Sequence, residues 1–164
     1  PARVALIGTP ATLAVAAAAL APAAVRLDIG LTSLPVSASA DFPAAFAKAR
    51  QGGARAILPI PSDIVISHTG LMRQLMREHR VPVMESFPGE GAEGDGLIGY
   101  GPDVDGCDRQ LTGQLLRVID GADPATLPIE QPTQIRLSIN LKVARELGLS
   151  VPRPLQLRAD RLVP

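Results

Sequence analysis

Residues 3–10 of the chain read RVALIGTP, and residues 11–21 read ATLAVAAAALA. The unbroken apolar run at residues 4–7 is typical of a strand that is buried on both faces, and the Gly-Thr-Pro after it is typical of a turn. The alanine-rich stretch favours a helix, because alanine has the highest intrinsic helix propensity. A buried strand that leads through a tight turn into a helix indicates an α/β fold with a parallel sheet.

The same alternation of apolar runs and helical patterns continues to residue 101. Apolar runs predict further strands at residues 25–34, 56–60, 81–87 and 97–100. Apolar positions at helical spacing predict helices over residues 41–51 and 64–79. These elements predict an α/β fold with a doubly wound, mostly parallel sheet.

The pattern changes after Pro102. Apolar residues at helical spacing predict an amphipathic helix over residues 103–120, with Asp103 as its N-cap. A proline-bearing connector follows, and the tail beyond Pro152 is predicted to be irregular. A strand and a short helix are predicted between them, over residues 134–139 and 141–147.

The composition argues against several classes of protein. Basic and acidic residues balance at 16 each, so the net charge is zero and we expect no nucleic-acid partner. The single Cys107 forms neither an intrachain disulfide nor a cysteine-based metal site, and we predict that it is a small core residue. Residues 11–25 are too short for a membrane span and contain Pro22, which favours a packed helix. No secretory signal is visible, and we expect the chain to be a piece of a longer protein.

The loops that follow the strands are the candidate binding site, because an open parallel sheet binds ligands at the carboxyl ends of its strands. Here these loops carry Thr9, Ser62, Asp63, Ser86 and Tyr100. Thr9 and the Ser62-Asp63 pair also stand at predicted helix starts, where backbone N–H groups and the helix dipole favour an anion. We therefore predict a site for a carboxylate or another small anion at this edge of the sheet. The alternative is that these are ordinary loops, since any α/β fold has loops of this kind.

Motifs for catalysis, metals or nucleotides are weak. Asp63 and His68 are five positions apart, so on a helix they diverge by roughly 140°, and Ser62 lies on no Gly-x-Ser-x-Gly elbow. We expect His68 and His79 to be partly buried structural residues. An acidic cation site is the alternative to a solvated loop at Glu85, Glu90, Glu93 and Asp95, although the spacing is not that of an EF-hand. No nucleotide-binding glycine pattern occurs, so the sequence predicts no enzyme, no metal and no cofactor.

The last part of the chain carries a distinctive order of short sequences. Residues 100–103 read YGPD, residues 127–132 read LPIEQP, and residues 137–149 read LSINLKVARELGL. This order resembles the C-terminal half of the ABC transporter substrate-binding proteins, which are similar to type I periplasmic binding proteins. Within them it resembles a subfamily like the tryptophan and aromatic amino acid-binding proteins. The match runs from Arg3 to about Asp160, and before Leu97 it rests on RVALI, on residues 41–63 and on LMREHRVPV at residues 75–83.

The resemblance implies two α/β lobes that clamp a solute between them. Residues 1–101 would form the second lobe, and residues 102–164 a return segment that completes the same domain or packs on a first lobe that is missing here. The helix over residues 103–120 would then pack on the first lobe in the full protein. In this chain its apolar face would be covered by the rest of the chain or by a second copy in a homodimer. The family's strand-end loops fall on Gly8-Thr9, Pro61-Ser62-Asp63 and Gly99-Tyr100-Gly101.

The function that the resemblance implies is non-catalytic capture of a small solute, amino acid-like or a small carboxylate, for an ABC permease. The implied location is periplasmic or extracytoplasmic. Residues 85–95 depart from the family's usual text, and with aromatic residues at 2% a stacked ligand would depend on Tyr100, Phe87 or the first lobe. The alternative is a ligand-sensing regulatory domain of a receptor or repressor that has the same lobe architecture.

Overall fold

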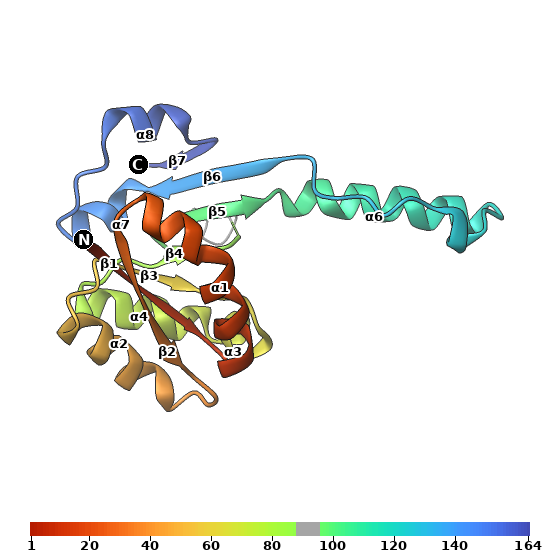
Figure 1. The fold of residues 1–164 in the computed structure, drawn as a ribbon. Coiled ribbons are helices and arrows are strands. Elements are labelled where there is room, and N and C mark those ends of the chain that lie inside the picture. The colour runs from red at the N-terminus through yellow and green to blue at the C-terminus, as the bar shows by residue number, and fades with distance from the viewer. Residues whose placement is uncertain (88–95) are drawn as a thin grey trace.

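The computed structural model describes residues 1–87 and 96–164, and it has the alternating α/β order that the sequence predicts (Figure 1). The strands are β1 (Ala2–Gly8), β2 (Ile29–Pro35), β3 (Ala56–Pro59), β4 (Met84–Glu85), β5 (Ile98–Pro102), β6 (Ile135–Asn140) and β7 (Arg161–Val163). The helices are α1 (Pro10–Arg26), α2 (Asp41–Gln51), α3 (Asp63–Ser67), α4 (Thr69–His79), α6 (Val104–Ile119), α7 (Leu141–Glu146) and α8 (Arg153–Arg158), with a 3-10 turn η1 (Pro124–Thr126).

The sheet is mostly parallel. Strands β2, β1 and β3 pair in that order, and β4, β5, β6 and β7 form a second run. The two runs meet where Ile57 of β3 forms a parallel bridge with Val83 and donates its N–H to Pro82 O at 2.7 Å. Only the β5–β6 pair is antiparallel among the described strand pairs, because β6 follows a chain segment that turns back on itself. The predicted fold class is confirmed.

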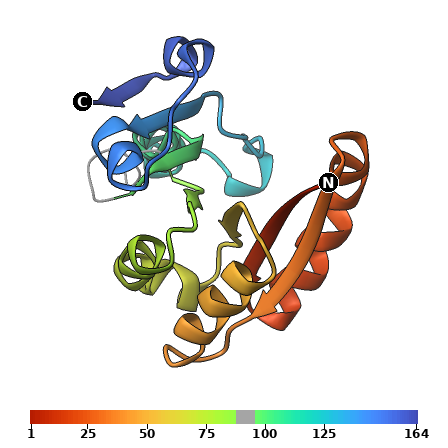
Figure 2. The same ribbon diagram turned by 90° about the vertical axis from the view of Figure 1, so that its left-hand side faces the viewer.

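Helices cover both faces of the sheet. Figure 2 shows α1 on one side of β1 and β2, and α2 and α4 on the other side. This division follows from right-handed crossovers, since β2 and β3 lie on opposite sides of β1. The core lies between the sheet and the α2–α4 layer, where Phe42, Phe46 and Met76 are fully buried. Each of these side chains contributes about 1.5–3 kcal/mol through burial.

Helix α1 is longer than predicted. It continues through Pro22 to Arg26, and β2 begins only at Ile29, so the prediction of a strand from residue 25 was wrong by about one helical turn. Nine of its 17 residues are alanine, and this propensity carries the helix beyond the proline, whose missing N–H removes one hydrogen bond. The helix ends where Asp28 takes a positive φ of 51°.

Two other predicted elements are interrupted. The helix predicted over residues 64–79 is broken at His68, whose φ of −116° lies outside the helical region. His68 Nδ1 lies 2.8 Å from Ile64 O, and the ring stacks on Phe42 with 5.3 Å between centroids. The ring of His79 packs on Phe46, so both histidines are half-buried on aromatic partners, as expected. The strand predicted at residues 81–87 is only Met84–Glu85.

The tail is ordered, contrary to the prediction. Helix α8 leads into β7, which pairs in parallel with β6. Asp160 fixes this return, because its carboxylate accepts the N–H of Leu137 at 2.7 Å and its own N–H donates to Leu137 O at 2.8 Å. The Asp160 carboxylate thus takes the place of a backbone carbonyl and extends the β6–β7 hydrogen-bond ladder by one bond. The apolar pattern of the sequence does not indicate such a contact.

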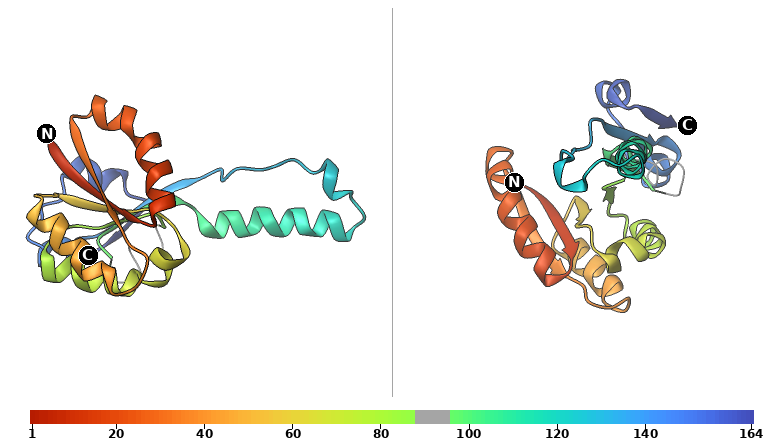
Figure 3. Two further views of the ribbon diagram at one scale, coloured as in Figure 1. Left: turned by 60° about the horizontal axis from the view of Figure 1, so that its bottom comes forward. Right: turned by 90° about the vertical axis from the view of Figure 1, so that its right-hand side faces the viewer.

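Residues 103–134, which we call the arm, project away from the rest of the chain, which we call the body. Figures 1 and 3 show α6 extending from the end of β5 and the chain returning along it to β6. The return is held by Gln114, whose amide donates to Pro128 O at 3.1 Å, and by Gln110, whose amide donates to Glu130 at 3.1 Å. No residue of α6 is buried, and Cys107 is half-buried on the arm, so its predicted place in the core was wrong.

Candidate functional site

The carboxyl ends of the parallel strands form one row along an edge of the sheet. The row is fixed by the pairings of Ile7 with Pro59, of Ile57 with Val83 and of Glu85 with Gly99. In the sheet order β2-β1-β3-β4-β5, the residues on this row are Pro35, Gly8, Ile60, Ser86 and Tyr100. Of the predicted site residues, Ser86 stands on the row, Thr9 directly follows it and Ser62 lies two positions beyond. Tyr100 is level with the row but lies within β5, which continues to Pro102, so it is not in a loop as the sequence predicted.

Two glycines allow close packing along this row. A Cβ on Gly8 would lie 2.8 Å from Thr12 Oγ1 and 3.2 Å from Ile60 Cβ. A Cβ on Gly101 would overlap the backbone carbonyl oxygen of Ser86. Since neither overlap is relieved by moving the end of a flexible side chain alone, glycine at both positions keeps the strand ends in contact and holds the loops that follow them close together.

Thr9 acts as the N-cap of α1. Its Oγ1 accepts the N–H of Thr12 at 3.2 Å and lies 3.1 Å from Thr12 Oγ1. Because Pro10 has no N–H and the N–H of Thr12 is already bonded, α1 offers fewer backbone donors to an anion than the sequence pattern predicts. Thr9 is at the predicted edge, and its hydroxyl is committed to the helix start.

Ser62 and Asp63 behave differently from each other. The Ser62 hydroxyl has almost no solvent access and makes no hydrogen bond to any described residue. Asp63 is exposed, and its backbone carbonyl accepts the Ser67 hydroxyl at 2.7 Å. The grouping of Ser62, Asp63 and His68 is not assembled as a catalytic unit, because the His68 ring contacts Ile64 O and Ser67 Oγ instead.

Ser86 lies at a small apolar hollow at the end of β4. Its walls come from α3, α4 and the loops that follow β3 and β4, and Ile66, Met72 and Phe87 supply apolar surface. The hollow is lined almost entirely by apolar atoms, and its volume of about 20 Å³ is room for a single water molecule. Tyr100 stands further along the same row, on β5 opposite Leu137, and it is 51% exposed.

A buried ion pair supports this hollow, and the sequence analysis missed it. Glu85 is 5% exposed, and both of its carboxylate oxygens accept from the Arg73 guanidinium, at 2.8 Å and 3.1 Å. Such a fork-to-fork pair fixes the direction of both side chains. The one indication in the sequence is that Arg73 lies beside the apolar stripe of the helix before Glu85. The two residues are twelve positions apart, and neither helical nor strand periodicity relates residues at that spacing.

The same pair bears on the predicted acidic cation site. Glu85 is occupied by Arg73, whereas Glu90, Glu93 and Asp95 lie outside the described residues. Within residues 1–87 and 96–164, no group of histidine, cysteine and acidic residues is arranged to hold a metal ion. Over the same residues, no helix has the length and apolarity that a membrane span requires.

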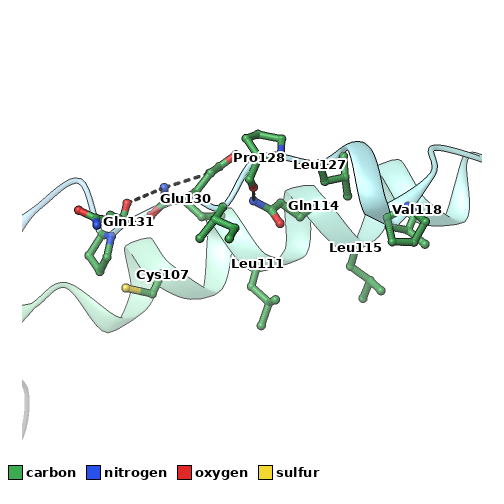
Figure 4. A pocket seen from close by; sticks show the side chains of 13 residues that line it. Cys107, Leu111, Gln114, Leu115, Val118, Leu127, Pro128, Glu130 and Gln131 are labelled. Atoms are coloured by element: carbon green, nitrogen blue, oxygen red, sulfur yellow. Dashed lines mark hydrogen bonds between the residues drawn. The ribbon is translucent and has the colours of Figure 1, made fainter.

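A second surface feature is the groove of the arm, which lies between α6 and the returning chain and has a volume of about 620 Å³. Three hydrogen bonds from the amides of Gln110 and Gln114 tie the returning chain to the helix along this groove. Figure 4 shows that Leu111 and Leu115 point away from the returning chain. These leucines are 68% and 56% exposed, so nothing in the described chain covers this face of α6.

Several solved structures share this architecture. An ABC domain from Streptococcus pneumonia in complex with L-Trp has a TM-score of 0.84 at 16% identity, over 99% of this chain and 56% of that one. A conserved domain protein from Vibrio cholerae has a TM-score of 0.83 at 20% identity, over 98% and 54%. The open, ligand-free structure of a substrate-binding protein with adhesive properties from Clostridium difficile has a TM-score of 0.70 at 13% identity, over 99% and 54%.

These identities establish the fold alone, and the chain spans little more than half the length of each structure. A search among curated proteins gives no match. The assignment comes instead from the family model described as ABC transporter substrate binding protein, which matches residues 4–163. The chain, with its row of strand ends and its projecting arm, therefore belongs to the ABC transporter substrate-binding protein family.

Proposed function

We propose that residues 1–101 are the second of two lobes that close around a small solute, and that residues 102–164 carry the chain across to the first lobe and back. The observation that supports this proposal is the row of strand ends with Thr9, Ser86 and Tyr100 along it. Strand ends of an open α/β sheet are where ligands bind, and closure against a second lobe would exclude water from such a site.

The arm supports the two-lobe arrangement. Its apolar residues Leu111, Leu115 and Ile119 are more than half exposed, and an apolar patch of this kind marks a surface that another protein surface covers. The matched structures contain almost as much chain again as this one. We infer that a first lobe of the same protein packs on α6, and that a homodimer would be the cover if it did not.

The solute that fits this edge has polar ends and an apolar side chain. Ser86 and Tyr100 supply hydroxyls that donate to or accept from a carboxylate or an amine, and the apolar residues around the hollow beside Ser86 supply a surface on which an apolar group can pack. An amino acid has this combination, and L-Trp is the ligand named for one of the matched structures. A small carboxylate without a side chain would use the hydroxyls and leave the hollow empty.

We infer from the family that the protein delivers its solute to an ABC permease and works outside the cytoplasm, in the periplasm or at the cell surface. The capture step that we propose is non-catalytic, as the assignment to a substrate-binding family implies. The lobe supplies hydrogen bonds and a shaped surface, and the free energy of binding drives closure of the lobes.

Isothermal titration calorimetry of the full-length gene product with amino acids, L-Trp among them, and with small carboxylates tests this function. We expect saturable binding of at least one of these solutes. Tyr100→Phe and Ser86→Ala each remove one hydroxyl and should weaken binding by about 5- to 10-fold, the equivalent of one hydrogen bond. Ser150→Ala, an exposed hydroxyl in the loop after α7, is the matched control and should bind as the wild type does. Absence of binding to every solute, or equal affinity of all three variants, would refute the proposal.

A further inference from the structure

The base of the arm contains a buried carboxylate that the proposed site does not use. Asp103 is the residue between β5 and α6, and its side chain is 9% exposed. Its backbone N–H donates to Gln134 O at 3.0 Å, which continues the backbone ladder of β5 and β6 by one bond to the base of the arm. Asp103 therefore stands where both connections between body and arm pass side by side.

Its carboxylate contacts one arginine from each side of this junction. Oδ2 accepts from Arg136 of β6, in the body, at 3.1 Å. The same oxygen lies 3.5 Å from the guanidinium of Arg109, which is on α6 in the arm. Gly106 leaves room for this arrangement, since a Cβ there would lie 3.0 Å from Asp103 Oδ2. One carboxylate thus links a strand of the body with the first turns of the arm helix.

At the N-cap of a helix, where Asp103 lies, an aspartate side chain ordinarily has a different role. Aspartate is a favoured N-cap because its carboxylate accepts a backbone N–H of the first helical turn. Asp103 has the extended backbone of an N-cap, with φ −70° and ψ 103°, yet its side chain makes no capping bond. The carboxylate is directed to Arg136 and Arg109 instead, so its contribution lies in the junction rather than in the helix start.

We propose that the cluster of Asp103, Arg136 and Arg109 is a hinge clamp that sets the direction in which the arm leaves the body. Helix α6 itself has no buried residue, so the buried Asp103 carboxylate is the point at which the start of the arm is anchored to the body. The clamp is partly open to solvent at its arginines, which are 47% and 70% exposed. Salt therefore weakens it, and it yields more readily than a fully buried pair.

This inference rests on the proposed function for one step only. If the arm carries the first lobe, its direction sets the angle between the lobes, and the clamp then biases the balance between open and closed forms. Breaking the clamp would change the affinity for solute without touching the row of strand ends. The direction of the arm itself is measurable without any solute.

The test is a distance measurement by pulsed electron paramagnetic resonance on the full-length gene product. Spin labels at Lys48→Cys on the body and Arg117→Cys on the arm, in a Cys107→Ser background, report the arm direction, and both sites are exposed. Asp103→Asn keeps the shape of the side chain and removes its charge, and we expect a broader distance distribution with a displaced maximum. Asp108→Asn removes an exposed carboxylate from the same helix and should leave the distribution unchanged.

Arg136→Gln is the second variant, chosen because its side chain is half exposed and the body should fold without it. It should reproduce the Asp103→Asn distribution, and the double variant should add nothing further. Distributions that match the wild type in both single variants would overturn the clamp. Because no solute is present, that outcome is separate from a failure to bind amino acids, which would overturn the proposed function and leave the clamp standing.

Discussion

Replacing Arg73 with methionine should strongly destabilise the protein. The substitution leaves the Glu85 carboxylate, which is 5% exposed, without the two bonds that it accepts from Arg73. Removing one partner of a buried ion pair costs about 3–5 kcal/mol, because the remaining charge stays away from water. By contrast, Arg77→Met breaks a 3.5 Å pair with Glu146 in which both side chains are at least one third exposed. An exposed pair of this kind contributes about 0–1 kcal/mol.

Urea denaturation followed by circular dichroism measures this difference. With a slope of about 2 kcal/mol per molar urea, the Arg73→Met midpoint should fall by about 1.5–2.5 M, and the Arg77→Met midpoint by less than about 0.5 M. Glu85→Gln in the Arg73→Met background removes the stranded charge and should recover most of the loss. Equal midpoints for the two arginine variants, or no recovery in the double variant, would show that the buried charge is not the cause.

Three further outcomes are expected. Gly101→Ala brings a Cβ against the Ser86 carbonyl and should lower the free energy of unfolding by at least about 1–3 kcal/mol. Gly113 on α6 has open space around it, so Gly113→Ala should raise the stability of the helix by up to about 1 kcal/mol. The urea midpoints of the two variants measure this difference. Phe46→Ala in the core should cost about 3–5 kcal/mol, and a thermal melt with an unchanged midpoint would contradict the assigned core. The backbone N–H groups of Ser37 and Ala38 donate to Asp41 and hold its pKa below the ordinary 3.8. A carboxyl group whose pKa is lower in the folded than in the unfolded protein stabilises the fold at a pH above the unfolded pKa, and this stabilisation is lost as the pH falls through the folded pKa. Asp41→Asn should therefore make the free energy of unfolding fall less steeply with pH at the acid end. Parallel plots of that free energy against pH for variant and wild type would disprove the contact.

Periodicity located most of the body because its elements are defined by local patterns. The apolar run before Gly8 and the phenylalanines of α2 are buried, as their spacing in the sequence predicts. The parallel arrangement of the strands follows from the alternation of strands and helices along the chain. The strand ends could likewise be placed along one edge from sequence, because parallel strands finish on the same side of a sheet. Thr9, Ser86 and Tyr100 are near that edge for this reason, while their roles as ligand contacts stay predictions.

What escaped prediction depends on contacts between distant residues. At the helix break the His68 ring stacks on Phe42, and just before β7 the Asp160 carboxylate accepts the N–H of Leu137. The pairing of Glu85 with Arg73 joins a strand end to a helix face, and nothing in the local pattern of either segment indicates the other. Such contacts decide where an element stops or turns, whereas apolar spacing decides only that it forms.

The leucines of the arm also affect how the folded protein should be assayed. Dyes such as ANS, which fluoresce on apolar surfaces, serve to detect molten globules. A preparation of these 164 residues alone would bind such a dye in its native state, through the ridge that Leu111 and Leu115 form on α6. Dye fluorescence would then report whether another protein surface covers this ridge. A fall in fluorescence on adding the protein surface that packs on α6 would measure binding of that surface and not folding of the chain.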